Sequence, residues 1–135
     1  FIMKIFGGCY CGAIKYKSLG DIQASIQCHC RECQYITGGH PNVLVIVPLD
    51  KFKFVKGHPK TYKRKDIKMA MNRLFCKDCG TAIGTKNPNR PNSIILKVGT
   101  FDDPSVFKAD IAIYTIDKQK FHYIEDGLKS FERKP

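Results

Sequence analysis

The chain has 135 residues, of which 43% are hydrophobic, and a formal net charge of +11. This length fits one domain, residues 1–135, with a small core. No apolar run approaches the about 20 residues of a membrane-spanning helix, so we expect no membrane association. The positive charge favours an anionic partner, such as a small dicarboxylate, nucleic acid or an acidic protein surface. A solvated basic surface without such a partner fits it too.

The N-terminal part predicts short strands that lead into two groups of cysteines. Phe1–Phe6 fits an edge strand, after which glycines surround Cys9 and Cys11. Ala13–Ser18 and Ile22–Gln27 are expected to be extended, and a Leu-Gly-Asp turn signal separates them. We therefore predict a hairpin here, which would place the first cysteine pair near the group that follows the second strand.

Three thiols then fall within six residues, at Cys28, Cys30 and Cys33. The segment Arg31–Ile36 predicts a short helix that ends at two glycines, the first of which is Gly38. The N-terminus of such a helix would help to stabilise thiolates and bound anions.

The middle of the chain predicts further strands. Asn42–Pro48 is apolar and favours a central strand. Lys51–Lys56 alternates, with its two phenylalanines facing the core, and Thr61–Lys65 is expected to be extended. Ile67–Leu74 fits either a strand or a helix.

The last third begins with Cys76 and Cys79 and continues as short segments separated by turns. Lys86–Asn92, which is rich in proline and asparagine, predicts an exposed loop. The expected strands are Gly80–Thr85, Ser93–Val98, Ile111–Ile116 and Gln119–Tyr123. Many short strands with turn signals between them favour a mainly β fold, either a sandwich or a barrel-like body.

All seven cysteines fall into these three groups, and this clustering indicates metal binding. A disulfide framework would leave one thiol unpaired. No apolar signal segment precedes the first group, so we expect a cytoplasmic protein, in which thiols stay reduced. Disulfides and inert buried thiols are the alternatives.

Four thiols can close a tetrahedral zinc site, and the other three leave one coordination position open. Two pairs suit the closed site because an extended C-x-C and a C-x-x-C knuckle each direct two sulfurs the same way: Cys9, Cys11, Cys76 and Cys79. The remaining three are close enough in sequence to hold a metal from one loop: Cys28, Cys30 and Cys33. Spacing alone also allows the opposite pairing.

The cysteine groups and several glycine motifs together resemble one known family over nearly the whole chain. The matching stretches include Gly8-Cys9-Tyr10-Cys11-Gly12, Cys28-His29-Cys30-Arg31-Glu32-Cys33, Gly57-His58-Pro59, Arg73-Leu74-Phe75-Cys76-Lys77-Asp78-Cys79-Gly80, Gly99-Thr100-Phe101-Asp102-Asp103-Pro104 and Asp126-Gly127-Leu128. Their order is similar to that of the glutathione-dependent formaldehyde-activating enzyme family, which includes the centromere protein V type of domain. The resemblance implies an Mss4-like fold of many short antiparallel strands pinned by zinc.

The resemblance also implies two zinc ions and an activity. A structural zinc would be held by Cys9, Cys11, Cys76 and Cys79, and a second, catalytic zinc by Cys28, Cys30 and Cys33. The implied reaction joins glutathione and formaldehyde reversibly to S-hydroxymethylglutathione, which makes the enzyme a carbon–sulfur lyase. The chain departs from many relatives at Ala112-Ile113-Tyr114, where they have His-hydrophobic-aromatic, and at Lys120-Phe121, where they have Pro-Trp. These departures bear on the substrate more than on the metals or the fold.

The histidines and the charged residues of the clusters have several possible roles. His29 is expected to flank the metal, because in extended structure it points away from its cysteine neighbours. The other histidines are expected on the surface: His40 and His58 in loops, and His122 on a strand. Four charged residues fit either exposure or a role in acid–base chemistry, orientation or carboxylate binding: Arg31, Glu32, Lys77 and Asp78.

Three functions are compatible with these patterns. The first is an enzyme in which a thiol such as glutathione, held at the open site, attacks a small aldehyde. The second is a non-catalytic zinc-binding β module that binds nucleic acid or an acidic partner through its basic surface, with a steep salt dependence. The third is a metal or thiol-redox sensor, which would lose zinc and form a disulfide under mild oxidation.

Overall fold

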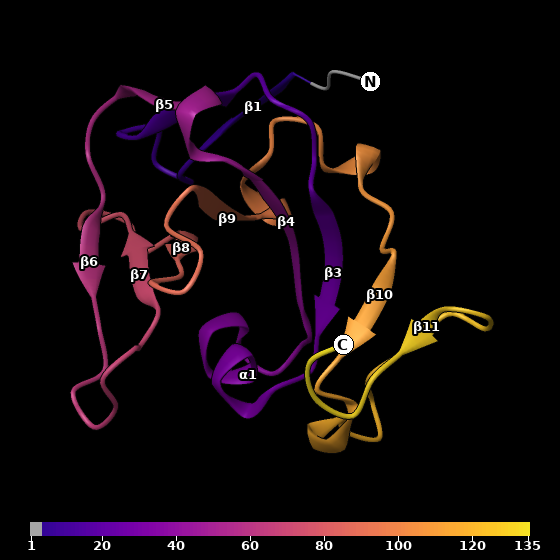
Figure 1. Cartoon of the computed structure of the whole chain (residues 1–135). Helices are drawn as coiled ribbons and strands as arrows, with labels where there is room; N and C mark the ends of the chain where they lie inside the picture. Colours follow the sequence, from indigo (N-terminus) through magenta and orange to yellow (C-terminus); the bar gives the residue numbers. More distant parts are fainter. Residues whose placement is uncertain (1–3) are drawn as a thin grey trace.

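The computed structural model describes residues 4–135, and most of its regular secondary structure is short strands in two sheets (Figure 1). The strands are β1 (Ile5–Gly8), β2 (Lys15–Ser18), β3 (Ala24–Cys28), β4 (Asn42–Pro48), β5 (Phe52–Lys56), β6 (Lys60–Tyr62), β7 (Asn72–Phe75), β8 (Ala82–Lys86), β9 (Ser93–Lys97), β10 (Ile111–Ile113) and β11 (Lys129–Ser130). The one α-helix of the described residues is α1 (Arg31–Thr37). Short 3₁₀ turns lie at Leu49–Lys51, Val98–Thr100, Pro104–Val106 and Thr115–Asp117.

The smaller sheet has the strand order β1-β2-β5, and the larger one has the order β11-β10-β3-β4-β9-β8-β7-β6. Most neighbouring strands are antiparallel, which confirms the predicted mainly β fold. Strand β10 differs, because it runs parallel to both β3 and β11. Because the two strands are parallel, the end of β10 lies beside the end of β3, with Ile113 opposite Cys28.

Strand β4 is buried on both faces, and this explains its continuous apolar sequence. Val45 and Val47 point into the main core, which also holds side chains from the smaller sheet. Leu44 and Ile46 point to the opposite face, where they join a second apolar cluster. Helix α1 lies at the end of β3 and β4 that is remote from β1 and β5 (Figure 1).

The predicted hairpin between the first two cysteine groups is wrong. Strand β2 pairs with β1 and β5, whereas β3 pairs with β4 and β10. The connection crosses from one sheet to the other, since Leu19 N–H donates to Lys51 O and Gln23 N–H donates to Ile46 O. A turn signal marks a change of direction, but the choice of neighbour depends on distant contacts.

Most other predicted helix and strand boundaries agree with the structure. The predicted helix is confirmed, and it ends at Gly38, whose φ of 84° suits glycine. The N-terminal edge strand is confirmed from Ile5 onward, and the part at residues 1–3 lies outside the described residues. The ambiguous segment before the last cysteine pair becomes a strand at Asn72. Gln119–Tyr123 was expected to be extended, but it forms turns instead.

Candidate metal centres and substrate cavity

Four cysteines from two distant segments form the first cluster. The turn after β1 supplies Cys9 and Cys11, and the knuckle between β7 and β8 supplies Cys76 and Cys79. Their sulfur atoms all lie within 4.8 Å of one another. The Sγ of Cys11 lies 3.6 Å from that of Cys9 and 3.8 Å from that of Cys76. We call this set the four-thiol cluster.

The four-thiol cluster is tied into the main core. Cys76 is 1% exposed, and the Ile14 N–H donates to the Cys9 sulfur at 3.2 Å. The Thr81 hydroxyl lies 3.1 Å from the Cys79 sulfur, and its hydrogen bonds lower the pKa of Cys79 to about 6. Backbone and hydroxyl donors of this kind stabilise thiolates and orient them.

Cys28, Cys30 and Cys33 form the second cluster, which we call the triplet. Cys28 is the last residue of β3, Cys30 is the N-cap of α1, and Cys33 lies in the first turn of that helix. Their three sulfurs also lie within 4.8 Å of one another, and the Cys33 N–H donates to the Cys30 sulfur at 3.2 Å.

Hydrogen bonds from Cys28 and Cys33 lower the pKa of Cys30. The Cys33 N–H, in the first turn of the helix, adds to this effect. The triplet therefore favours a thiolate, which is the form that binds a metal.

Both clusters fit a zinc ion by their donor chemistry. A tetrahedral site with Zn–S bonds of about 2.3 Å requires sulfurs about 3.8 Å apart. The separations of 3.6 Å and 3.8 Å in the four-thiol cluster are close to this value, and the triplet sulfurs lie within 4.8 Å of one another. All seven cysteines are free thiols. The four-thiol cluster would complete the zinc coordination, whereas the triplet would leave it one ligand short.

The triplet borders the larger cavity, which has a volume of about 680 Å³. Apolar side chains from β3, β4, β9 and β10 line it: Ile26, Leu44, Ile46, Ile95 and Ile113. Its lining also includes three arginines and two acidic residues: Arg31, Arg73, Arg90, Glu32 and Asp117. A cavity of this size suits a small-molecule ligand.

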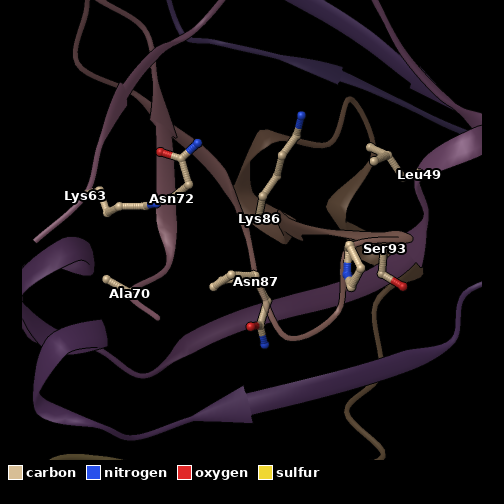
Figure 2. Close-up of a pocket in the computed structure, with 9 residues that line it drawn as sticks. Leu49, Lys63, Ala70, Asn72, Lys86, Asn87 and Ser93 are labelled. Carbon is tan, nitrogen blue, oxygen red and sulfur yellow. The ribbon is translucent and has the colours of Figure 1, made fainter. Parts of the chain in front are cut away.

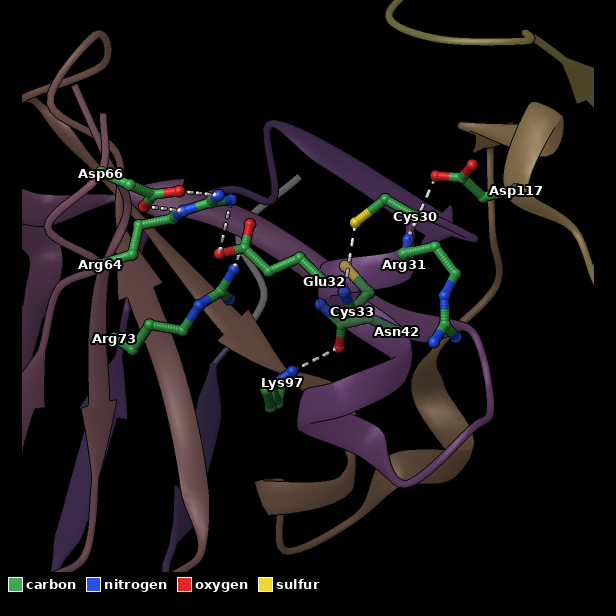
Figure 3. A network of polar contacts seen from close by, with 10 residues as sticks. All are labelled: Cys30, Arg31, Glu32, Cys33, Asn42, Arg64, Asp66, Arg73, Lys97 and Asp117. Carbon is green, nitrogen blue, oxygen red and sulfur yellow. Dashed lines mark hydrogen bonds and ion pairs between the residues drawn. The ribbon is translucent and has the colours of Figure 1, made fainter. Parts of the chain in front are cut away.

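The charged residues beside the triplet form a connected network (Figure 3). Glu32 accepts from Arg73 at 3.0 Å and lies 3.9 Å from Arg64. Lys97 donates to Asn42 Oδ1 at 2.8 Å, and burial lowers the pKa of Lys97 to about 8. Glu32 is therefore engaged by two arginines, which favours an orienting role over that of a free base.

His122 is buried, so its predicted place on a strand surface is wrong. Its Nε2–H donates to Gly39 O at 2.8 Å, and its Nδ1 lies 2.9 Å from His29 Nδ1. The other ring nitrogen of His29 lies 2.9 Å from the Gln27 amide nitrogen, and Gln34 donates to His29 O at 2.9 Å. Both rings are satisfied as neutral imidazoles, and burial lowers the pKa of His29 to about 4.

Except for Arg31, whose backbone N–H donates to Asp117 Oδ2 at 3.2 Å (Figure 3), the remaining predicted residues lie apart from this network. His40 and His58 are exposed as expected, and Lys77 and Asp78 are exposed at the knuckle of the four-thiol cluster. Arg31 lines the cavity, and its guanidinium lies over the ring of Tyr35.

Tyr114 also lines the cavity, and only its place in the family-like stretch marks it in the sequence. Its φ of 56° is the one positive value among the described non-glycine residues. Such a conformation is unfavourable for a bulky residue and is found disproportionately at functional sites. Burial raises the pKa of its phenol, which therefore remains a hydrogen-bond donor at neutral pH.

A second cavity of about 340 Å³ lies near the loop that follows β8 (Figure 2). Lys63, Asn72, Lys86 and Asn87 contribute its polar lining together with Ser93, and Leu49 and Ala70 contribute apolar atoms. No cysteine, histidine or carboxylate lines it, so it offers neither metal ligands nor an acid–base pair.

None of the helices in the described range, residues 4–135, has the length and apolar character required to span a membrane.

Comparison with known proteins supports the family resemblance. The family model described as glutathione-dependent formaldehyde-activating enzyme matches residues 4–117. A crystal structure of a Rhodobacter sphaeroides protein superimposes with a TM-score of 0.60 at 18% sequence identity, covering 79% of this chain and 97% of that one. At this identity the structural match concerns the fold alone.

Proposed function

Because this chain belongs to the glutathione-dependent formaldehyde-activating enzyme family, we propose that it catalyses the reversible addition of a thiol to an aldehyde. The thiol would be glutathione, and the reverse reaction makes the enzyme a carbon–sulfur lyase. The proposal includes two zinc ions per chain, one held by the four-thiol cluster and one by the triplet.

The observation that carries this proposal is the difference between the two clusters. The four-thiol cluster has enough ligands to close a metal site, whereas the triplet has three and borders a cavity of about 680 Å³. Structural zinc sites are closed, and catalytic ones keep a position for substrate. When bound at the triplet, zinc would lower the pKa of a coordinated substrate thiol and so supply a thiolate at neutral pH.

Residues of the cavity can bind and orient glutathione. Its carboxylates match the guanidinium groups of Arg31 and Arg90, which form paired hydrogen bonds with planar anions. Arg73 is held by Glu32, so it supplies a fixed positive charge beside the triplet. Lys97, anchored to Asn42, adds a second positive charge near the triplet from outside the cavity lining.

The addition is balanced without any redox partner. The sulfur forms a bond to the carbonyl carbon, the carbon–oxygen π bond breaks, and the proton lost by the thiol ends on the new hydroxyl. Tyr114 lines the same cavity, and its hydroxyl would donate a hydrogen bond to that oxygen. In the reverse direction the same contact would stabilise the alkoxide as the carbon–sulfur bond breaks.

The test is exchange NMR of glutathione with ¹³C-formaldehyde, with and without the zinc-loaded protein. We expect the protein to accelerate exchange between free and adduct carbon, and Cys30→Ser to remove this acceleration. Native mass spectrometry of the same sample should show two zinc ions. An absence of acceleration both with formaldehyde and with longer alkyl aldehydes, with both zincs bound, would reject the enzyme and leave the non-catalytic binding module.

A further inference from the structure

Four aliphatic side chains line one face of the triplet cavity, and we call them the apolar floor: Ile26, Leu44, Ile46 and Ile95. This floor bears on which aldehydes the site would prefer. We propose, on the basis of the function above, that the preferred aldehyde carries an apolar chain of several carbons and that formaldehyde is a poor substrate. The product would be the thiohemiacetal of glutathione and an alkyl aldehyde. The bond changes are those of the thiol addition already described, and no further reactant is needed.

The strand register places the floor in rows that lead away from the triplet. Cys28 of β3 lies opposite Asn42 of β4, at the triplet end. Ile26 and Leu44 form the next row on the same face. Ile46, paired with Ile95 of β9, lies one row further. Since same-face residues are about 7 Å apart along a strand, these aliphatic rows extend about 14 Å from the thiols.

The floor belongs to an apolar cluster distinct from the main core. Ile26, Leu44 and Ile46 are less than 10% exposed, and Ile95 and Ile113 are partly buried against them. The cavity borders this face, and its lining also includes Met71 and Pro135. A methyl or methylene group placed in the cavity would leave water and contact these aliphatic side chains.

Formaldehyde and longer alkyl aldehydes give adducts that differ in how far they extend along the floor. A formaldehyde adduct has a single carbon beyond the sulfur, which cannot reach either aliphatic row. A chain of several methylenes extends over both rows while its thiol half remains beside the triplet and the arginines. Charge complementarity at the arginines and apolar contact at the floor thus favour one amphipathic occupant.

The experiment compares linear aldehydes from formaldehyde to hexanal, each with glutathione and zinc-loaded protein. Exchange NMR gives the catalysed kcat/KM, which is divided by the uncatalysed rate constant to remove differences in electrophilicity. We expect this ratio to rise about fourfold for each methylene that is buried, and at least a hundredfold from formaldehyde to hexanal. An equal or larger ratio for formaldehyde would overturn the inference while leaving the proposed function intact.

Two variants test whether the preference for longer aldehydes depends on the apolar floor. Ile95→Asn puts an amide into the third row, and we expect the hexanal-to-formaldehyde ratio to fall at least tenfold. Val55→Asn also replaces a β-branched apolar side chain by an amide, but on the exposed side of β5 and outside the cavity, so the ratio should not change. Thermal melting checks that each variant is folded. Equal ratios in a folded Ile95→Asn protein and the wild type would contradict the assignment.

Binding measurements separate failure of this inference from failure of the function. Calorimetry with S-hexylglutathione and S-methylglutathione needs no turnover, and we expect the hexyl compound to bind at least tenfold tighter with a more negative heat-capacity change. Selective hexyl binding without any aldehyde turnover would reject the proposed function but retain the apolar subsite. Equal affinities would reject the subsite.

Discussion

The two cysteine clusters use the same donor atom in opposite surroundings. The four-thiol cluster joins segments about 65 residues apart and contributes Cys76 to the main core. The triplet comes from one continuous segment and borders the cavity. A metal that joins distant segments stabilises the fold, whereas one held within a single loop can be lost with less effect on folding.

The strongest test of this difference is Cys76→Ser. We expect this variant to lose its cooperative thermal transition, because structural zinc is worth about 10–16 kcal/mol in small zinc-binding domains and a whole domain is stable by only about 5–15 kcal/mol. Circular dichroism during heating measures this directly. A variant that melts within a few degrees of the wild type would show that the four-thiol cluster is not structural.

Cys30→Ser should separate activity from folding. Thiol exchange should fall to the uncatalysed rate, because the open site loses a ligand. The loss of stability should be only about 1–2 kcal/mol, since serine is itself a favoured N-cap and can still accept from the Cys33 N–H. Urea unfolding and exchange NMR on the same sample check both parts. Destabilisation as large as that of Cys76→Ser would remove the distinction between the clusters.

A smaller effect is expected at the histidine pair that supports the triplet. His122→Ala leaves the Nδ1 of the buried His29 ring without a partner, while Nε2 keeps its contact with Gln27, and this should cost about 1–3 kcal/mol of unfolding free energy. The matched control is His58→Ala, an exposed position where the change should stay within about 0.5 kcal/mol. Equal stability of the two variants in urea would mean that the pair does not support the triplet loop.

The smallest effect concerns the core beside the four-thiol cluster. Tyr16 is buried, its hydroxyl lies 2.7 Å from Thr100 Oγ1, and burial raises its pKa to about 12. The unfolded chain loses this proton near pH 10, so stability contributed by neutral Tyr16 should decline as the pH rises from 10 to 12. Tyr16→Phe should cost about 1 kcal/mol at pH 8 and should lack this part of the decline. Parallel urea titrations at pH 8 and 11 measure the difference, and identical pH dependence in both proteins would contradict it.

Much of the fold could be predicted because local patterns were strong. The helix Arg31–Thr37 has its N-cap and its terminal glycine in the sequence, and Asn42–Pro48 is apolar throughout. The hairpin prediction failed because a turn signal does not identify the partner strand. The strand predicted at 111–116 ended early, because Tyr114 takes up a left-handed conformation that no local signal announces.

In the site, too, features set by local spacing were predicted, and features set by distant contacts were not. The cysteine spacing predicted two sets of thiols, and the structure brings together Cys9 with Cys76 across the chain. The role of His122 was missed, because its only signal is a polar residue between aromatic ones, and its partner His29 lies 93 residues away. The apolar floor was also invisible, since Ile26, Leu44 and Ile95 come from three strands and share a face only after pairing.

By itself, the sequence determined the cysteine groups, the mainly β character and the family, because these depend on residue type and on spacing within short stretches. Only the tertiary structure decided which strands pair, which histidine supports the triplet and what lines the cavity beside it. Those features depend on contacts between residues far apart in the chain. Their free energy comes from burial and hydrogen bonding that exist only when the sheets have formed.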